Sequence, residues 1–257
     1  MIEGRLALAE TLARRAGALL REGYGKAMRV DRKGAVDLVT EYDVRCEEVL
    51  LEGIRGAYPD DAVLAEESGA SGSGEVRWYL DPLDGTSNFV HSLPIFSVSI
   101  ACARNGQLIL GVIYDPMRDE LFAGAIDRGA WLNERRLHVS ATRTLNDCLA
   151  GTSFPYDLRT NADNNLAQFS AMCLRAHDVR RLGSAAVNLA YVAAGRLDAY
   201  WGMRLSAWDL AAGMVLVREA GGQISRMDGR PDPLSEPTSL LASNGLVHAS
   251  FVEVLSA

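Results

Sequence analysis

The sequence of 257 residues has few of the cysteines, histidines and long apolar runs that form disulfide frameworks, soft-metal sites or membrane spans. Its four cysteines are scattered without a C-x-x-C pair, which indicates reduced, mostly packed thiols. Its four histidines are equally dispersed and show no zinc spacing such as H-E-x-x-H. No apolar run approaches the roughly 20 residues of a membrane span. The first residues also lack the basic segment and apolar core of a signal peptide. We therefore expect a cytoplasmic protein that has no membrane partner.

The net charge argues against binding to nucleic acid or to an anionic membrane. The formal net charge is −7, with 23% of the residues charged. An acidic chain has little general affinity for nucleic acid or for an anionic membrane, so neither is expected as a partner. If the substrate is itself an anion, metal ions must reverse the sign of the local field.

Composition and pattern predict one compact unit of helices and strands. Hydrophobic residues make up 48% of the chain, an ordinary value for a globular protein. Residues 1–145 contain two predicted helices and then alternating runs around Asn105-Gly106, which indicate antiparallel strands. In residues 146–257 strands alternate with helices, which is typical of an α/β arrangement. We predict an α/β (α+β) unit with an antiparallel N-terminal sheet and a mixed or parallel C-terminal sheet.

One short stretch carries most of the functional information. Residues 81–89 read Asp-Pro-Leu-Asp-Gly-Thr-Ser-Asn-Phe and follow an apolar run that predicts a strand. Pro82 fixes its own φ and keeps the residue before it extended, while Gly85 permits a sharp or left-handed bend. We expect Asp81 and Asp84 to converge on one point at the strand end. Hard oxygen ligands packed in this way suit Mg²⁺ or Mn²⁺, and the alternative interpretation is an acidic surface turn.

Other carboxylates occur at the ends of predicted strands or the starts of predicted helices. Glu66 and Glu67 follow a short predicted strand. Asp43 and Asp209 lie near the starts of predicted helices. Taken singly, the glutamates fit a solvated loop and the aspartates fit simple helix caps. Their occurrence together with the Asp-Pro-Leu-Asp stretch favours a shared acidic site.

Other motif classes fit this pattern poorly. Phosphatases of the haloacid dehalogenase type use D-x-D-x-T with the first aspartate as nucleophile. Here both Pro82 and Leu83 separate the aspartates, and that class does not explain the upstream Glu-Glu. The spacing of a calcium-binding EF-hand and that of a Walker loop are absent. Residues 72–74 lack the third glycine of a dinucleotide fingerprint and are interpreted as a flexible loop.

The order of these motifs resembles the inositol monophosphatase family over nearly the whole chain. The resemblance is carried by residues 36–40 with Asp43, by residues 64–68, 78–88 and 183–186, and by residues 208–213 and 219–222. The motifs around Asp81 and Asp209 are the signatures of that family. The resemblance implies a layered α/β sandwich that hydrolyses a phosphate monoester.

The resemblance also implies two to three Mg²⁺ ions, or Mn²⁺, in the carboxylate cluster. The expected ligands are Glu66, Asp81, the Leu83 carbonyl, Asp84 and Asp209, with Asp81 bridging two ions. Glu67 is expected to help a third, weaker ion or its waters. Such ions neutralise an anionic substrate and lower the pKa of bound water, which is consistent with this chemistry.

A second set of residues is implied to position water and substrate. Thr86, paired with Asp43, is expected to orient the attacking water. The phosphate and the rest of the substrate are expected to contact Gly85, Thr86, Ser87, Gly183, Ser184, Ala185 and Arg32.

Two positions depart from the animal inositol enzymes. A lysine of their mobile loop falls opposite Arg32, and arginine and lysine hold phosphate differently. The glutamate that contacts inositol hydroxyls there is replaced by Gly202, and losing a hydroxyl-binding group relaxes or redirects selection. The residues that could redirect it are Arg181, Arg204 and Ser206.

We therefore interpret the chain as a Mg²⁺-dependent phosphatase that uses metal-activated water, with an inositol monophosphate as the expected substrate. The alternatives are histidinol phosphate, fructose 1,6-bisphosphate, a nucleotide 3′-phosphate, NADP, or a non-catalytic regulatory member of the family. The resemblance also implies a homodimer and competition by lithium for a metal site.

Overall fold

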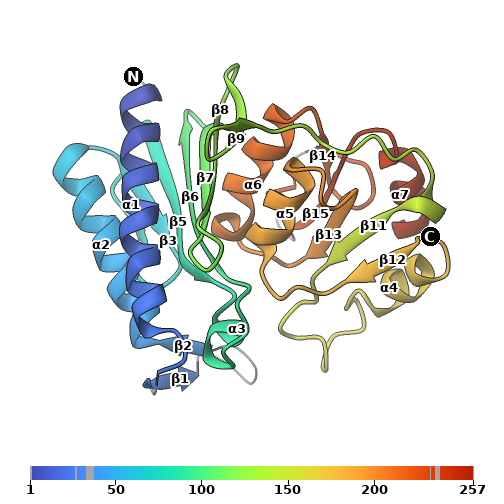
Figure 1. Ribbon diagram of the computed structural model, residues 1–257, viewed down its shortest axis with the longest axis horizontal. Coiled ribbons are helices and arrows are strands. Elements are labelled where there is room, and N and C mark those ends of the chain that lie inside the picture. Colours follow the sequence, from blue (N-terminus) through green and yellow to red (C-terminus); the bar gives the residue numbers. More distant parts are fainter. Residues whose placement is uncertain (1, 27, 33–37, 232, 235–237, 257) are drawn as a thin grey trace.

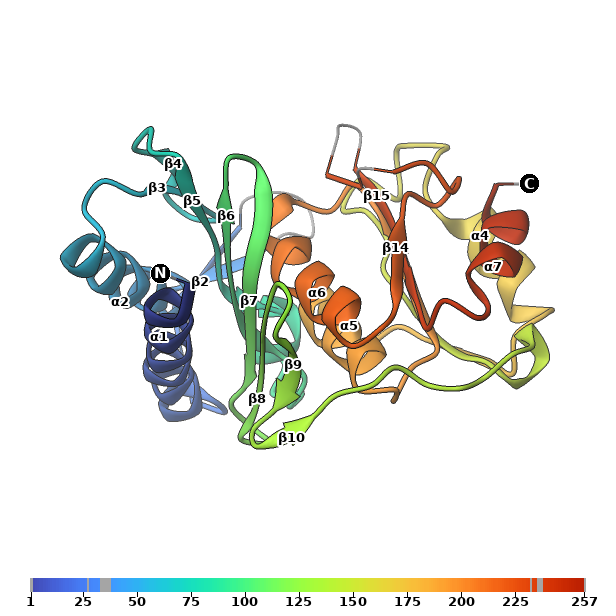
Figure 2. The ribbon, with the colours of Figure 1, turned by 90° about the horizontal axis from the view of Figure 1, so that it is seen from above.

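The computed structural model describes residues 2–26, 28–32, 38–231, 233–234 and 238–256. Helices and sheets alternate in layers (Figure 1). The helices are α1 (Ile2–Gly23), α2 (Glu41–Ala57), α3 (Thr86–Val90), α4 (Leu166–Cys173), α5 (Ala185–Ala193), α6 (Ala207–Glu219) and α7 (His248–Leu255), with the 3₁₀ turn η1 (Leu145–Asp147). Figures 1 and 2 show α1 and α2 outside the first sheet, α5 and α6 between the two sheets, and α4 and α7 beyond the second sheet. The predicted layered α/β sandwich is confirmed.

The first sheet has eight strands in the order β10-β9-β8-β7-β6-β5-β3-β4. Their bounds are β3 (Ala62–Ala65), β4 (Gly69–Ser71), β5 (Val76–Asp84), β6 (Ser97–Arg104), β7 (Gln107–Asp115), β8 (Glu120–Ala125), β9 (Gly129–Leu132) and β10 (Arg135–Arg136). Its pairings are antiparallel apart from β3 with β5. Asn105 and Gly106, both at positive φ, make the predicted hairpin between β6 and β7.

The second sheet has five strands in the order β12-β11-β13-β15-β14. Their bounds are β11 (Leu149–Thr152), β12 (Asp178–Arg180), β13 (Ala199–Met203), β14 (Gln223–Ser225) and β15 (Ser239–Ser243). Strand β11 is parallel to β12 and β13, whereas β15 is antiparallel to β13 and β14. This is the mixed sheet predicted for the second half. A separate hairpin of β1 (Val30–Arg32) and β2 (Leu38–Thr40) leads into α2.

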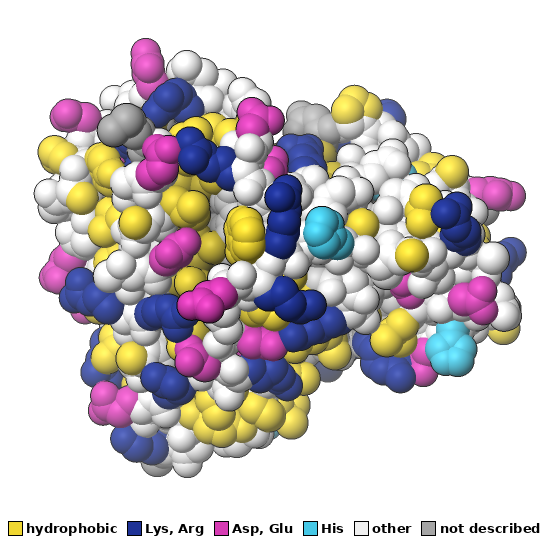
Figure 3. All heavy atoms as spheres, turned by 45° about the horizontal axis from the view of Figure 1, so that its top comes forward, with side chains coloured by type: hydrophobic (Ala, Val, Ile, Leu, Met, Phe, Trp, Pro, Cys, Tyr) yellow, Lys and Arg dark blue, Asp and Glu magenta, His cyan; other side chains and the backbone are white. Residues whose placement is uncertain are grey.

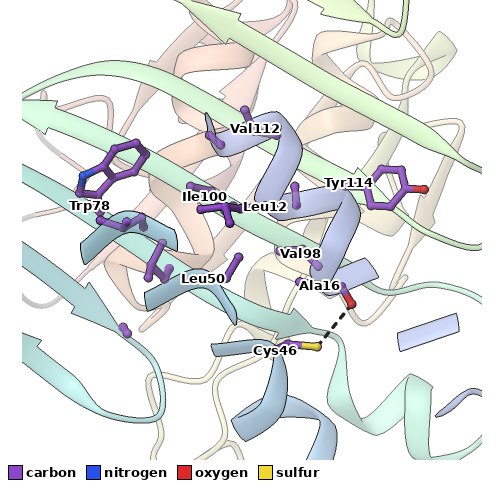
Figure 4. Packing of buried hydrophobic residues seen from close by; sticks show 14 of the residues in the cluster. Leu12, Ala16, Cys46, Leu50, Trp78, Val98, Ile100, Val112 and Tyr114 are labelled. Carbon is purple, nitrogen blue, oxygen red and sulfur yellow. Dashed lines mark hydrogen bonds between the residues drawn. The ribbon is translucent and has the colours of Figure 1, made fainter. Parts of the chain in front are cut away.

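Both faces of the first sheet are buried. On one face α1 and α2 pack on the strands, with Leu12, Leu50, Trp78 and Ile100 fully buried (Figure 4). On the other face α6 lies directly against β7, where a Cβ on Gly111 would come within 2.4 Å of the Ala212 carbonyl oxygen. The predicted boundary between two subdomains near residue 145 stays a prediction, because a helix from the second half covers one face of the first sheet.

No helix in the described ranges combines the length and apolar character that crossing a bilayer requires.

Candidate metal and phosphate site

The end of β5 places two carboxylates on one face of the first sheet. Asp81 lies opposite Ser99 and Asp84 lies opposite Ser97, with a β-bulge between the two pairs. In a regular strand residues three apart point to opposite faces, so the bulge brings both aspartates to the same side. Sequence reasoning expected the strand to end before this segment, but β5 continues to Asp84. The bend comes at Gly85, whose φ is 102°.

The position of Pro82 explains why the strand can continue through it. Strand β3 pairs with β5 only as far as Leu80, opposite Ala65. Beyond that point β6 is the one strand that pairs with β5 among the described residues, and a proline without an N–H group is tolerated at a sheet edge. The chain leaving β3 continues directly into Glu66, whose N–H donates to the Leu80 carbonyl. The end of β3 therefore brings a third carboxylate beside β5.

The fourth carboxylate comes from the first turn of α6. Asp209 accepts a hydrogen bond of 2.7 Å from the Ser206 N–H and forms a capping box with that residue. The helix lies on the face of the sheet to which Asp81 points, since the Ser99 hydroxyl donates to the carbonyl of Trp208 at 3.2 Å. Asp209 is thus both a helix cap and a member of the acidic cluster.

The carboxylates influence one another strongly because they are buried together. Burial raises the pKa of Asp81 well above its usual value, and the charges of Glu66, Asp84 and Asp209 raise it further. Burial and the charges of Asp84 and Glu66 likewise raise the pKa of Asp209 well above its usual value. Asp81 lies within hydrogen-bonding reach of both Glu66 and Asp209. Like charges in low dielectric favour shared protons or a bound cation.

The cluster fits a hard divalent cation by its donor set. All the carboxylate and carbonyl groups involved are oxygen donors, which Mg²⁺ and Mn²⁺ prefer over the nitrogen and sulfur ligands typical of zinc. Within the described ranges, no group of three or more His, Cys, Asp or Glu side chains is already placed as the ligand set of a metal ion. The carboxylates instead form hydrogen bonds with one another and with backbone N–H groups. The fit of a divalent cation to this cluster therefore rests on the oxygen donors and on the mutual repulsion of the carboxylates.

Asp43 and Thr86 are brought together as sequence reasoning expected. The Thr86 hydroxyl lies 3.0 Å from Asp43 Oδ1 and 3.0 Å from the Leu83 carbonyl oxygen. The other oxygen of Asp43 accepts bonds from the N–H and hydroxyl of Thr40, at 2.8 and 2.6 Å. Asp43 is fully buried, and burial raises its pKa to about 6. Its orientation is fixed by the capping box at the start of α2.

Asp84 ties the two halves of the molecule together. It accepts hydrogen bonds from the Ser184 hydroxyl and from the N–H groups of Ala185 and Ala186, at 3.1 and 2.7 Å for the two amides. Ser184 is also the N-cap of α5, because its hydroxyl accepts from the Val187 N–H. A carboxylate from β5 therefore satisfies the first amides of a helix in the second half.

Two residues that position this site were missed by sequence reasoning. Glu47, buried one turn after Asp43 on α2, accepts bonds of 2.8 Å from the N–H groups of Glu67 and Ser68. It thereby fixes the loop that follows β3, and its i, i+4 spacing from Asp43 was the available signal. Asn88 donates to the carbonyls of Ile95 and Leu182, at 2.7 and 2.8 Å, and so joins α3 to the segment before α5.

A cavity of 410 Å³ opens above the carboxylates. Its floor is lined by Asp84, Gly85, Thr86, Ser87 and Asp209, and its wall by residues 153–156, Arg181–Gly183, Ala185 and Arg204–Ser206, with Asn88 between them. Most of the expected substrate contacts thus face one space. Ser184 is buried and is not among the lining residues.

Arg32 lies outside the lining of this cavity. It ends β1, where it pairs with Leu38 of β2. The adjacent Lys33 falls outside the described residues. A contact between Arg32 and a substrate therefore stays a prediction.

Gly202 is buried beneath the wall of the cavity and is not itself a lining residue. A Cβ added there would lie 2.7 Å from Leu205 Cδ1 and 3.2 Å from the Tyr200 hydroxyl. Leu205 occupies the space that a side chain at position 202 would enter, and it lines the cavity instead. This end of the site therefore presents the apolar side chain of Leu205 to the cavity.

Comparison with known proteins agrees with this geometry. A model of the Inositol monophosphatase family matches residues 2–256. The chain is 45% identical over 245 residues to an inositol-1-monophosphatase from Synechocystis sp., covering 94% of this chain and 85% of that protein. It is 44% identical over 247 residues to a Nus factor SuhB from Pseudomonas aeruginosa, covering 93% and 91%.

Among solved structures, an inositol monophosphatase from Anabaena (Nostoc) sp. superposes with a TM-score of 0.91 at 40% identity, covering 99% of this chain and 96% of that one. These similarities extend over both sheets and over the segments that carry the acidic cluster.

Proposed function

The chain belongs to the inositol monophosphatase family and is a phosphoric monoester hydrolase, and we propose that it cleaves a small phosphate monoester, an inositol monophosphate first of all, with Mg²⁺ as cofactor. The observation that carries this proposal is the set of mutually repelling carboxylates on the floor of the cavity. A site of this kind binds an anion only when cations are present.

The metal would be held by Glu66, Asp81, the Leu83 carbonyl, Asp84 and Asp209, with Glu67 beside them. Mg²⁺ bound there would neutralise the charge of the phosphate and lower the pKa of a bound water molecule. The protein contributes the fixed positions of these oxygens: the bulge in β5 aligns Asp81 with Asp84, and α6 presents Asp209 to both.

Asp43 and Thr86 would orient the attacking water. The Thr86 hydroxyl has one proton, and donating it to Asp43 Oδ1 leaves its lone pairs free to accept from a water molecule. Asp43 cannot turn away, because Thr40 holds its other oxygen. Gly85, Thr86 and Ser87 would contact the phosphate at the same end of the cavity.

The test is phosphate release from inositol 1-phosphate by purified protein with Mg²⁺ and with EDTA, alongside thermal unfolding. We expect turnover only with Mg²⁺ and a rise in Tm on adding it, since a ligand that binds the folded state stabilises that state. Histidinol phosphate, fructose 1,6-bisphosphate, a nucleotide 3′-phosphate and NADP complete the substrate panel. Absence of phosphate release from every compound by folded, Mg²⁺-loaded protein would sink the proposal.

The relative named Nus factor SuhB favours a second candidate, a role as a Nus factor beside or instead of catalysis. A variant that lacks phosphatase activity distinguishes these two candidate functions. If Asp81→Asn restores growth or regulation in a strain that lacks the gene, the non-catalytic role is supported. Failure of this folded variant to complement favours the enzymatic role.

A homodimer is the assembly that we propose for this chain. A hollow of 1210 Å³ lies between α1, β8 and β9, lined by apolar groups that include Leu6, Ile126 and Trp131. Figure 3 shows a face on which hydrophobic side chains gather between charged ones. Apolar surface rimmed by charge is typical of association sites. Light scattering of the wild type and of Trp131→Glu tests this assembly, and a monomeric wild type would contradict it.

A further inference from the structure

The wall of the 410 Å³ cavity is attached at one end to the second sheet. Ser153 is the first residue of this wall and directly follows the last residue of β11. Its N–H donates to the carbonyl of Trp201 in β13 at 3.2 Å, and its carbonyl accepts from the Asn165 side chain at 2.7 Å. The backbone of Ser153 is therefore held on both sides.

The side chains of Thr152 and Ser153 point to opposite faces of the second sheet, because side chains alternate along an extended chain. The hydroxyl of Thr152 donates to the Trp201 carbonyl at 3.0 Å and accepts from Asn165 at 2.9 Å. Asn165 in turn accepts from the Trp201 indole at 2.7 Å, on the side of the sheet that α4 and α7 cover. The side chain of Ser153 consequently lies on the other side, where α5 and α6 pack.

A tyrosine of β13 reaches Ser153 on that side. Tyr200 is fully buried among residues of α5 and α6, and its hydroxyl lies 2.8 Å from Ser153 Oγ. Gly202 follows two residues later on the same face of the strand. A Cβ at that position would lie 3.2 Å from the Tyr200 hydroxyl, which is closer than most such contacts in proteins. The absence of a side chain at position 202 therefore leaves the space that this hydroxyl occupies.

The buried phenol determines the direction of this hydrogen bond. Its one proton has Ser153 Oγ as acceptor, and the Tyr200 hydroxyl has no other partner among the described residues. The reverse direction would bury a phenol proton without an acceptor, which costs more free energy than a typical hydrogen bond contributes. Burial raises the pKa of Tyr200 and the charges of Asp84 and Asp209 raise it further, so the phenol keeps its proton. Tyr200 therefore donates and Ser153 accepts.

The proton of the Ser153 hydroxyl is then available to a ligand in the cavity. In the part of the chain that the structure describes, Ser153 Oγ is bonded to Tyr200 alone, so its own proton has no protein acceptor. The side chains of Phe154, Pro155 and Leu205 on the same wall are apolar and offer none. A hydroxyl in such surroundings gains from a ligand that supplies the missing acceptor. The reacting phosphate has its place at the floor, so this acceptor belongs to the remainder of the substrate.

We propose that Ser153 is a specificity residue that donates a hydrogen bond to a hydroxyl oxygen of the substrate, and that Tyr200 is the residue that positions it. This proposal rests on the proposed phosphatase function and names a contact of the alcohol part of the ester. The donor is uncharged, and the alcohol part of a polyol phosphate carries uncharged hydroxyl oxygens that accept such a bond. An ester without these hydroxyls leaves the Ser153 proton unpaired and is selected against.

The experiment compares phosphate esters that have the same carbon skeleton with and without hydroxyls. One pair is myo-inositol 1-phosphate with cyclohexyl phosphate, and the other is glycerol 2-phosphate with propan-2-yl phosphate. The readout is the change in kcat/KM that Ser153→Ala causes for each compound in the presence of Mg²⁺. Where the hydroxyl-free ester turns over too slowly, its inhibition constant against the hydroxylated member of the pair replaces kcat/KM.

Ser153→Ala should lower kcat/KM for the hydroxylated member of at least one pair by roughly 3- to 10-fold, the range for one neutral hydrogen bond. It should leave the hydroxyl-free member unchanged, because that ester makes no such bond. The matched control is Ser170→Ala, since Ser170 is exposed on α4 and does not line the cavity. This control should change neither member of either pair.

The role of Tyr200 is tested by a double-mutant cycle. Tyr200→Phe removes the donor that orients the Ser153 hydroxyl and should lower the same kcat/KM by a smaller factor. If Tyr200 acts through Ser153, adding Tyr200→Phe to Ser153→Ala should cause no further loss. The double variant also removes both partners of the buried hydrogen bond, so it carries the test if Ser153→Ala alone fails to fold.

The proposal is overturned if folded Ser153→Ala, or the double variant in its place, changes both members of each pair equally or changes neither. Additive losses from the two substitutions would overturn the role of Tyr200. These outcomes require measurable hydrolysis, so they leave the proposed phosphatase activity standing. Failure of that activity would instead appear as no phosphate release from any of the four compounds by the wild type with Mg²⁺.

Discussion

The floor of the cavity is acidic, whereas its wall is basic. Beneath the lining of the floor, Asp43 and Asp81 are almost inaccessible to solvent, and neighbouring backbone and side-chain donors orient them. On the wall, Tyr156 is 69% exposed and Arg181 extends from a loop over a single ring. The floor is formed by the ends of strands and the first turns of helices, and the wall by connecting segments.

This difference separates reaction chemistry from substrate choice. A carboxylate cluster works only if several oxygens keep fixed positions, and rigid elements provide such positions better than loops do. A loop wall can change its charge and shape without disturbing those oxygens. We therefore expect substitutions on the floor to abolish turnover and substitutions on the wall to change preference.

The largest effect should come from the centre of the floor. Asp81→Asn removes the charge that couples Glu66, Asp84 and Asp209, and we expect a loss of kcat/KM on the order of 10³-fold. In EDTA the same variant should unfold at the same or a higher temperature than the wild type, because it relieves repulsion. The exposed Asp60→Asn serves as control for phosphate release and for Tm. Wild-type turnover in Asp81→Asn would remove the floor from the mechanism.

The next largest effect should come from position 202, which lies beneath the wall of the cavity. Gly202→Glu places a Cβ 2.7 Å from Leu205 and buries a carboxylate, so we expect it to destabilise the fold, by about 1–3 kcal/mol. Chemical denaturation measures this loss. The double variant Gly202→Glu with Leu205→Ala should recover part of it, and only that protein would report on recognition of inositol hydroxyls. A fully stable single variant would contradict the packing described for Leu205.

A smaller effect should follow from removing the hydrogen bond that joins the two halves of the molecule. Ser184→Ala removes a donor to Asp84 and the N-cap of α5, and we expect a loss of about 1 kcal/mol in the free energy of unfolding. The Mg²⁺ concentration for half-maximal activity should also rise, because Asp84 is held less firmly. Ser184→Thr, which keeps the hydroxyl, is the matched control. An unchanged Mg²⁺ requirement in Ser184→Ala would show that this tie has no role in holding the floor.

The smallest effect should come from a group remote from both regions. His248 is buried, with its Nδ1 and Nε2 each 2.8 Å from a serine hydroxyl, those of Ser243 and Ser225 respectively. Burial lowers the pKa of His248, so the unfolded chain binds more protons than the folded one below its usual value of 6.5. The contribution of His248 to stability is therefore lost as the pH falls through about 6.5.

Urea denaturation at pH 7.5 and pH 5.5 measures the His248 contribution. On going from pH 7.5 to pH 5.5, His248→Gln should gain stability relative to the wild type, and the exposed His177→Gln should not. A wild-type value retained in His248→Gln would contradict this role of His248, because the raised pKa values of the floor carboxylates stabilise the folded state as the pH falls, which is the opposite direction.

Sequence patterns predicted the floor better than the wall, for physical reasons. Alternating apolar runs, Asn105-Gly106 and the helix-opening Asp209 act through local backbone preferences, which a single sequence displays. The bulge that aligns Asp81 with Asp84 depends on which strand lies beside β5, and that pairing is not local. The contact of Leu205 with Gly202 arises only when the chain after β13 folds back over that strand.

The bond between Asp84 and Ser184 joins residues 100 positions apart. At ribosomal rates of 5 to 20 residues per second, Asp84 is synthesised roughly 5 to 20 s before its partner. Throughout that interval the nascent chain carries Glu66, which follows β3, and the aspartates of β5 without the amides of α5, and the sheet face that α6 later covers is open. The acidic cluster is accordingly among the last parts of the molecule to mature during translation.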